Sequence, residues 1–205
     1  MKNKKLLISI ISLVIIILFI VGIIVLNSNK KPKDLTVTHT AIIEIEDYGN
    51  IALELYGNMA PITVKNFTSL AQKGFYDGLS FHRIIEGFMM QGGDPEKNGL
   101  GGSDKKIKGE FTLNGIENTI SHTRGIISMA RSQSFNSASS QFFIVQQDRV
   151  FLDGQYAAFG VVTSGMEVVD KICSKAKPID DNGSIEINKQ PVIKKIVVKE
   201  AKIEN

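Results

Sequence analysis

The strongest constraint on the fold is an alternation of apolar and polar side chains in two neighbouring segments. The segments "AIIEIE" (residues 41–46) and "IALELY" (residues 51–56) place an apolar residue at every second position. This is the period of a β-strand with one buried face. The residues between them, Asp47-Tyr48-Gly49-Asn50, are types that favour a tight turn. The pattern therefore predicts a β-hairpin.

Short strand patterns continue along the chain, and helical periodicity interrupts them twice. Apolar residues recur at helical spacing after Pro61, which suits a first helical turn, and Gly74 suits the helix end. A second helix is expected over Met166–Cys173. Many short strands with glycine-rich turns favour closure, because closure removes exposed strand edges. We therefore expect a mainly β domain, a closed antiparallel eight-stranded β-barrel capped by two α-helices, with further strands at residues 80–85, 88–91, 126–129, 142–146, 157–162 and 192–198.

The N-terminal part of the chain has the composition of a membrane anchor. A basic tail (residues 1–5) precedes an apolar run without any charge (residues 6–26). At about 1.5 Å per residue this run spans roughly 31 Å, which matches the hydrocarbon core of a bilayer. A cleavable signal peptide has a shorter apolar core, of about 7–15 residues. We therefore expect an N-terminal transmembrane helix that acts as an uncleaved signal anchor, with cleavage as the alternative, followed by a polar linker (residues 27–39).

The orientation of this anchor follows only weakly from charge. Three lysines lie on each side of the apolar run, so the lysine bias hardly decides between the two orientations. A short basic tail before a long domain favours the tail inside the cell and the domain outside. The sequence thus predicts a single-pass protein of the cell membrane with an extracytoplasmic domain.

Composition argues against several function classes. Of the 24 basic residues, six lie in residues 1–33, which leaves 18 basic against 21 acidic residues in the remainder. A mildly acidic domain without lysine or arginine clusters is poorly suited to binding nucleic acid. The single cysteine, Cys173, excludes an internal disulfide and a cysteine metal cluster, and its apolar surroundings predict a buried thiol. We expect a monomer without cofactor or metal.

Two motif-based alternatives have little support. The loop "GGDPEKNGLGG" does not have the glycine spacing of a phosphate-binding motif. A serine–histidine–acid triad stays open, because the chain contains His82, His122 and many serines, but it has no G-x-S-x-G elbow. Both histidines are expected to be structural, and a hydrolase remains a minor alternative.

Five segments together resemble the cyclophilins, a family of peptidyl-prolyl cis–trans isomerases. They are "APITVKNF", "FHRIIEGFMMQGGD", "SMARS", "SSQFFIV" and "FLDGQYAAFGVV", in the order and at roughly the spacing of that family. The resemblance covers residues 40–200, which leaves a short C-terminal tail (residues 201–205). It implies a barrel-fold isomerase whose substrates are proline-containing peptides and unfolded or newly exported proteins. The alternative is a chaperone or assembly factor that holds proline segments in the same groove.

The chemistry of this isomerisation agrees with the residue types in these segments. Rotation about the bond before proline crosses a barrier of about 18–20 kcal/mol, yet no covalent bond is made or broken. The twisted state loses amide resonance and leaves a free lone pair on the prolyl nitrogen. A cationic donor beside apolar walls binds that state better than either planar state, so no nucleophile is needed.

The resemblance also implies a role for individual residues. Arg83 resembles the donor to the prolyl nitrogen, Gln91 resembles the amide that positions the substrate carbonyl and orients the arginine, and Phe88 belongs to the same catalytic group. The implied substrate-binding residues are Met89, Gly99, Ala130, Arg131, Gln141, Phe143, Phe151, Leu152 and Tyr156.

This chain departs from the pattern of the eukaryotic members at three of these positions. It has Phe151 where they often carry tryptophan, Tyr156 where they have histidine, and Arg131 where asparagine is common. These differences resemble bacterial members. We expect them to affect substrate and inhibitor preference more than catalysis.

Overall fold

The predicted hairpin opens the sheet in the computed structural model, which describes residues 34–201. Strands β1 (His39–Ile45) and β2 (Gly49–Leu55) pair antiparallel, and their buried positions alternate along the sequence. Asp47 adopts a φ of 61° and Gly49 a φ of 121° in the connecting turn. The alternation thus identified both strands and their buried face.

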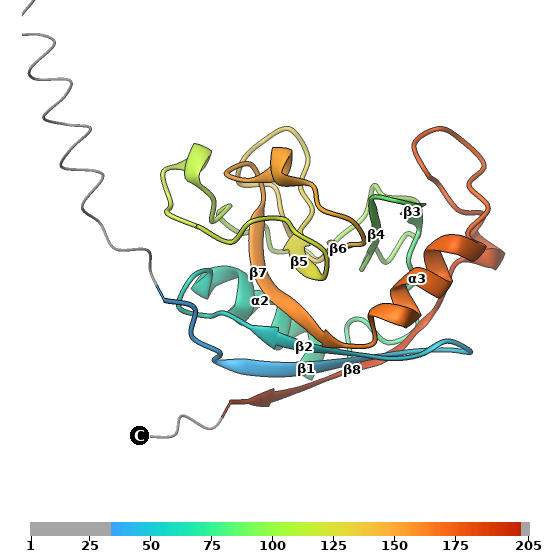
Figure 1. The fold of residues 1–205 in the computed structure, drawn as a ribbon, viewed down its shortest axis with the longest axis horizontal. Coiled ribbons are helices and arrows are strands. Elements are labelled where there is room, and N and C mark those ends of the chain that lie inside the picture. Colours follow the sequence, from blue (N-terminus) through green and yellow to red (C-terminus); the bar gives the residue numbers. More distant parts are fainter. Residues whose placement is uncertain (1–33, 202–205) are drawn as a thin grey trace, which may run out of the picture. The chain divides into compact units, whose positions relative to one another are not determined.

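Six further strands complete one antiparallel sheet. They are β3 (Arg83–Ile85), β4 (Met89–Gly92), β5 (Ile126–Met129), β6 (Phe142–Val145), β7 (Ala157–Ser164) and β8 (Ile193–Glu200). The strand order is β3-β4-β6-β5-β7-β2-β1-β8, and every neighbouring pair is antiparallel. Figure 1 shows that the sheet curls, with β7 bending from the layer of β1, β2 and β8 toward the layer that contains β5 and β6.

The prediction of a closed barrel is wrong, because the two end strands do not form a ladder with each other. The segments beside β3 and β8 meet only through the isolated bridge Ser80↔Val192, with backbone bonds such as Phe81 N–H to the Pro191 carbonyl, at 2.9 Å. Pro191 has no N–H to extend this pairing. β3 itself has only three residues. The sheet is therefore a curled half-barrel.

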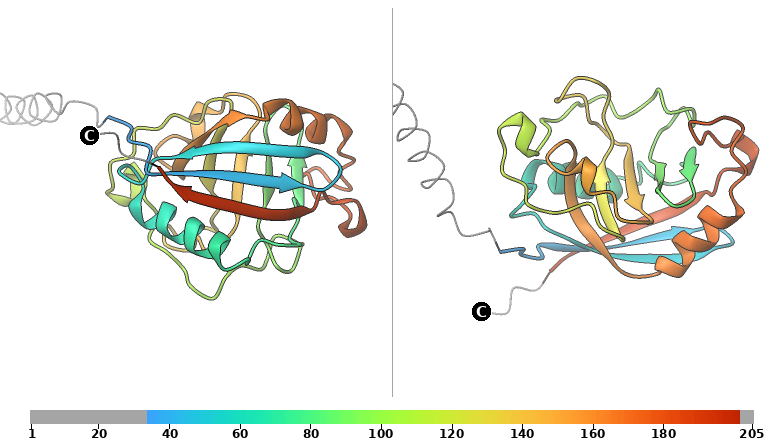
Figure 2. Two further views of the ribbon diagram at one scale, coloured as in Figure 1. Left: turned by 90° about the horizontal axis from the view of Figure 1, so that it is seen from below. Right: turned by 45° about the horizontal axis from the view of Figure 1, so that its top comes forward.

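Both helices predicted for the domain are present. Helix α2 (Pro61–Gln72) begins at the predicted proline, and Gly74 follows its end with a φ of 69°. Helix α3 (Met166–Lys175) extends the predicted segment by two residues. α2 packs against β7 and β8, whereas α3 packs against β2 and β4. Figure 2 shows the two helices on opposite sides of the strands β2, β1 and β8.

Three short 3-10 helices lie in the connections: η1 (Thr112–Asn114), η2 (Val150–Leu152) and η3 (Ile187–Lys189). Cys173 is buried in α3, as expected, and burial raises the pKa of its thiol to about 12. The thiol is therefore protonated at neutral pH, and an unreactive core residue fits this environment.

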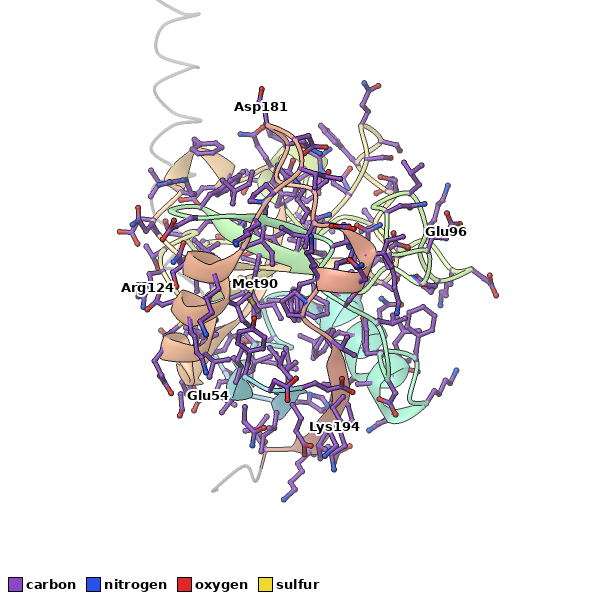
Figure 3. The ribbon with its side chains drawn as sticks, turned by 90° about the vertical axis from the view of Figure 1, so that its right-hand side faces the viewer. Glu54, Met90, Glu96, Arg124, Asp181 and Lys194 are labelled. Atoms are coloured by element: carbon purple, nitrogen blue, oxygen red, sulfur yellow. The ribbon has the colours of Figure 1, made fainter. Side chains whose placement is uncertain are left out.

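The strands β4, β5 and β6 bury side chains on both faces. One face packs into an inner core, which includes Ile43, Leu53, Phe67, Ile84, Met90, Ile127, Ile144 and Phe159. The opposite face supports an outer cluster of Tyr56, Met59, Met89, Ile120, Ile126, Phe143, Val145, Leu152 and Ala158. Figure 3 shows Met90 in the interior of the domain. Burial on both faces explains why "FFIV" in β6 is uninterrupted by polar residues.

Several sequence predictions fall outside the described residues. They are the basic tail (1–5), the membrane anchor (6–26), the first part of the linker (27–33) and the end of the C-terminal tail (202–205). Within residues 34–201, no helix has the length and apolar character that crossing a bilayer requires.

The first turn of α2 depends on a residue distant in sequence. Its N-cap residue is Ala60, whose side chain offers no hydrogen-bond acceptor. The carboxylate of Glu110, which is buried, accepts instead from the backbone N–H groups of Ile62 at 3.0 Å and Thr63 at 2.8 Å. These N–H groups have no partner within a helix, so Glu110 takes the place of a local cap.

We predict that Glu110→Gln destabilises the domain by about 1–2 kcal/mol, because an amide replaces one of two accepting oxygens with a donor. Urea unfolding at neutral pH measures the effect. Glu117→Gln is the matched control, since it removes the same charge from an exposed side chain nearby. Equal stability of the two variants would contradict the capping role.

Candidate active site

One row of side chains crosses five strands on the outer face of the sheet. Arg83 in β3 pairs with Gln91 in β4, and Gln91 pairs with Phe143 in β6. Phe143 then pairs with Ser128 in β5, and Ser128 pairs with Ala158 in β7. Residues directly opposite each other in a sheet project to the same face. The strand register therefore brings a cation, an amide and an aromatic ring side by side.

The polar end of this row is a chain of hydrogen bonds with a fixed direction. Arg83 Nη1 donates to Gln91 Oε1 at 3.2 Å, and Gln91 Nε2 donates to Gln141 Oε1 at 2.8 Å. Gln141 Nε2 donates to the carbonyls of Gly99 at 3.1 Å and Gly101 at 2.7 Å. A guanidinium can only donate and a carbonyl can only accept. The two ends therefore determine the orientation of both amides.

A backbone carbonyl holds the arginine from its other side. Arg83 Nε donates to the carbonyl of Asn182 at 2.7 Å. The turn that presents this carbonyl requires Gly183, which has a φ of 85°. A Cβ at this position would clash with Ile85 Cγ1 and would lie only 2.8 Å from the carbonyl oxygen of Ile84. Sequence reasoning missed this contact, because a backbone atom leaves no signature in the residue type.

Arg83 is thus held in place, but not all of its N–H groups donate hydrogen bonds to the protein. Its guanidinium has five N–H groups, and the bonds to Asn182 and Gln91 occupy two of them. Burial lowers the pKa of Arg83, and the nearby Tyr156 and Asp180 oppose this effect. An arginine remains protonated at neutral pH even after such a shift. A ligand in the adjacent hollow therefore meets a fixed cation with free donors.

The hollow beside Arg83 has a volume of about 400 Å³, and we name it the apolar pocket after one wall, which is formed by Phe88, Met89, Phe143 and Leu152. Met89, Phe143 and Leu152 belong to the outer cluster, so their positions are set by packing. The Phe88 ring lies 6.1 Å from that of Phe151, and the guanidinium of Arg149 lies 5.5 Å from the Phe88 centroid. This pocket can exclude water from a small apolar ring.

Most of the predicted site residues come together here. Ten of the twelve line the apolar pocket: Arg83, Phe88, Met89, Gln91, Gly99, Ala130, Arg131, Phe143, Leu152 and Tyr156. Gln141 lines an adjoining polar pocket of about 300 Å³ and reaches the site through Gln91. Phe151 contacts Phe88 from outside and is 60% exposed.

Arg131 makes more contacts within the protein than a rim position suggests. Its Nε donates to the carbonyl of Gln155 at 2.9 Å, and its guanidinium lies about 5 Å from the rings of Phe111, Phe135 and Tyr156. These cation–π contacts and hydrogen bonds hold Tyr156, which lines the apolar pocket, close to the loop that contains Phe135. Arg131 therefore supports the pocket by packing.

His122 joins the pocket wall to η2. Its Nδ1 lies 2.9 Å from Asp153 Oδ1 and its Nε2 lies 3.0 Å from Ser128 Oγ, while its ring stacks on Phe143. Burial lowers the pKa of His122, although the bond to Asp153 acts in the opposite direction. Burial raises the pKa of Asp153, but hydrogen bonds from Ser121 and His122 outweigh it, so that pKa is lowered overall. His122 thus braces Phe143, as the sequence led us to expect.

The same contacts place Ser128, His122 and Asp153 in the order of a catalytic triad. Ser128 and His122 are fully buried, and neither lines the apolar pocket. A nucleophilic serine must reach its substrate. The geometry therefore gives no support to the hydrolase alternative.

Sequence reasoning also missed His82 as part of the pocket wall. Its ring is buried beneath Gly99, and neither ring nitrogen has a hydrogen-bond partner in residues 34–201. Asn98, Leu100 and Ser184 complete the lining. The sequence analysis placed His82 in a predicted strand (residues 80–85) and treated it as structural, because neighbours in a strand face opposite sides and Arg83 faces the site. It precedes β3, so strand alternation does not apply to it.

Comparisons with a family model and with curated proteins all point to peptidyl-prolyl cis-trans isomerases. Residues 40–203 match the family model described as cyclophilin type peptidyl-prolyl cis-trans isomerase/CLD. The chain is 47% identical over 138 residues to the peptidyl-prolyl cis-trans isomerase cypE of Dictyostelium discoideum, covering 65% of this chain and 86% of the relative. It is 45% identical over 144 residues to a peptidyl-prolyl cis-trans isomerase of Helicobacter pylori, covering 69% and 85%.

Solved structures share the fold. A cyclophilin type peptidyl-prolyl cis-trans isomerase of Cryptosporidium parvum, crystallised in the presence of the dipeptide Ala-Pro, superposes with a TM-score of 0.69 at 31% identity. The match covers 78% of this chain and 98% of that chain. Another crystal structure of the Cryptosporidium protein gives a TM-score of 0.70.

The two buried histidines predict a loss of stability in weak acid. Burial lowers the pKa of His82 and His122 below the ordinary 6.5, so the unfolded chain binds protons that the folded chain does not. Stability is therefore full above about pH 6.5 and falls as the pH drops below it, by at most about 1.4 kcal/mol per pH unit for each histidine.

Urea unfolding measured from about pH 8 to about pH 5.5 tests this dependence. We expect His82→Gln and His122→Gln each to reduce the loss of stability at low pH relative to the unmodified chain. Above about pH 7.5 the three proteins should show parallel profiles, since neither histidine titrates there. If both variants lost as much stability at low pH as the unmodified chain, the two histidines would not be the cause of the pH dependence.

Proposed function

This chain belongs to the cyclophilin-type peptidyl-prolyl cis-trans isomerases, and we propose that it accelerates rotation about X-Pro bonds with Arg83 as the donor to the prolyl nitrogen. The apolar pocket takes the proline ring, and Gln91 orients the guanidinium. The single observation that carries this assignment is the position of Arg83, held at the rim of the apolar pocket with donors to spare.

The proposed mechanism is differential binding of a twisted imide. In the planar substrate the prolyl nitrogen shares its lone pair with the carbonyl, so it accepts a hydrogen bond poorly. At the twisted state the lone pair is free, and a free N–H group of Arg83 donates to it. An interaction made only at the twisted state lowers the barrier without tightening ground-state binding.

The rigidity of Arg83 increases the value of this interaction. The bonds to the Asn182 carbonyl and to Gln91 hold the guanidinium before substrate arrives, so little reorganisation is needed during rotation. A charge-assisted hydrogen bond contributes about 1.5–3 kcal/mol net. An acceleration of about 10⁵-fold requires roughly 7 kcal/mol, so other contributions are needed as well.

The apolar walls provide those contributions. Met89, Phe143 and Leu152 are almost fully buried, and they hold a proline ring while the preceding carbonyl turns. Exclusion of water also strengthens the interaction with Arg83, because the effective dielectric constant falls. The amide chain through Gln91 and Gln141 leads from Arg83 toward the rim, where the residue before proline lies in this assignment.

We further propose that the chain acts at the outer side of the cell membrane on newly exported proteins. The support comes from the sequence: residues 6–26 form an uncharged run of bilayer length, and residues 27–39 form a polar connection to the domain. A tethered isomerase would meet its substrates while they are still unfolded and their X-Pro bonds are still exchanging.

We predict that Arg83→Ala lowers kcat/KM for a proline peptide about a hundredfold, because loss of about 1.5–3 kcal/mol corresponds to roughly 10- to 150-fold. A protease-coupled isomerisation assay on the full-length chain measures the rate. Arg124→Ala is the matched control, since it removes an arginine that pairs with Asp170 and does not line the apolar pocket.

Equal rates for the Arg83→Ala protein and the unmodified chain would end the catalytic assignment. If that variant also rescued a deletion phenotype fully, the chaperone alternative, in which the groove only holds proline segments, would take its place.

Membrane topology gives a separate prediction. A lysine-specific protease added to intact cells should release the domain, because Lys30, Lys31 and Lys33 lie in the linker. A cytoplasmic protein detected in the same samples should stay intact. Release only after the cells are permeabilised would place the domain on the cytoplasmic side.

A further inference from the structure

Besides the polar pocket that Gln141 lines, another hollow adjoins the apolar pocket. This side pocket has a volume of about 620 Å³, and none of the predicted site residues lines it. It lies between the segment around Asn98 and the segment 179–188. His82, Asn98 and Ser184 line both hollows, so the side pocket continues the apolar pocket along the surface.

Exposed apolar side chains gather around these two hollows. Ile179 is 69% exposed and Ile187 is 62% exposed at the side pocket, and Leu100 is 86% exposed at the apolar pocket. Ile185, which is buried, also lines the side pocket. Solvent-exposed apolar groups that border a hollow are typical of a surface that binds a partner.

The walls of the side pocket are held in place by the protein itself. Ile179 N–H donates to the Ser184 carbonyl at 2.8 Å, and Ser184 N–H donates to Asp180 Oδ1 at 2.9 Å. Gln190 Nε2 connects the two sides, since it donates to the carbonyls of Lys97 at 2.9 Å and Ile185 at 2.8 Å. The pocket is therefore formed before any ligand binds.

Three charged residues, Lys97, Asp180 and Glu186, also line the side pocket, and both carboxylates have partners within the domain. Glu186 is paired with Lys189 at 2.5 Å, on the exposed side of η3. Figure 3 shows Asp181 at the tip of its loop, pointing away from the domain. His82, the shared wall, is buried and has a lowered pKa, so this wall carries no charge at neutral pH.

We propose that the side pocket is a second substrate subsite, which takes an apolar side chain of the same polypeptide whose proline lies in the apolar pocket. This inference rests on the proposed function, because it needs a polypeptide in the apolar pocket. The occupant follows from continuity: a chain leaving the apolar pocket past Ser184 or Asn98 meets Ile179 and Ile187 next.

Such a subsite would favour unfolded substrates over folded ones. An apolar side chain near a proline is buried once a protein has folded, and it is available only in an extended, unfolded segment. The enzyme would then prefer unfolded chains over exposed prolines in folded proteins, without reading any sequence beyond an apolar residue at a suitable distance.

Steady-state isomerisation by the full-length chain in a mild detergent tests the subsite. One substrate is a short proline peptide that fills only the apolar pocket. The others are longer glycine–serine peptides with the same proline and one leucine placed at successive distances on either side. We expect KM to fall roughly fivefold at one distance, as partial burial of one apolar side chain would give.

The variants Ile179→Ser and Ile187→Ser should remove this gain and leave the rate on the short peptide unchanged. Both side chains are exposed, so folding should not suffer. Leu113→Ser is the matched control, because Leu113 is 61% exposed and lines neither hollow. A KM independent of the leucine, or unchanged by both isoleucine variants, overturns the proposal.

Two further outcomes separate this proposal from its alternatives. Loss of activity on the short peptide in Arg83→Ala, together with no leucine effect in the unmodified chain, would reject the subsite and keep the proposed function. Sedimentation that shows a dimer, converted to a monomer by Ile179→Ser, would assign the side pocket to a second copy of the chain and overturn the subsite.

Discussion

The register between β3 and β4 is the constraint on which the site depends. It places Arg83 opposite Gln91, and a slip of one residue would turn Arg83 toward the inner core and Ile84 toward the pocket. Two backbone bonds hold the register from the other side of β3: Ile84 N–H donates to the Gly183 carbonyl, and Ile185 N–H donates to the His82 carbonyl. A three-residue strand is thus fixed along both edges.

Burial on both faces of the same strands links stability to the site. In β6, Phe142 and Ile144 face the inner core while Phe143 and Val145 face the outer cluster. The wall of the apolar pocket is therefore the outer side of the most buried part of the sheet. Its side chains have little freedom, because neighbouring strands pack on every side. The polar chain that begins at Arg83 lies on this rigid support, which keeps the guanidinium aimed at the pocket.

Sequence reasoning succeeded where a local pattern or a family segment carried the information. Alternation and turn chemistry identified the strands, and the quoted segments identified Arg83, Gln91 and the apolar walls. Closure of the sheet was wrongly predicted, because it depends on Pro191 and on the short β3, which meet only in the folded chain. The Asn182 carbonyl and the side pocket were not predicted for a similar reason: both depend on segments that meet only in the folded chain. Ile179 is an ordinary isoleucine in a polar segment until the fold brings it beside Ile187.

The distant cap on α2 has a consequence for the order in which the domain can form. The Thr63 N–H and the Glu110 carboxylate are 47 positions apart. During synthesis the helical segment emerges first, and its opening turn lacks this acceptor until the later loop arrives. Without the acceptor the first N–H groups of α2 stay unpaired, so the helix gains its full stability only together with the long-range contact. The same carboxylate then makes helix formation coincide with collapse of the whole domain.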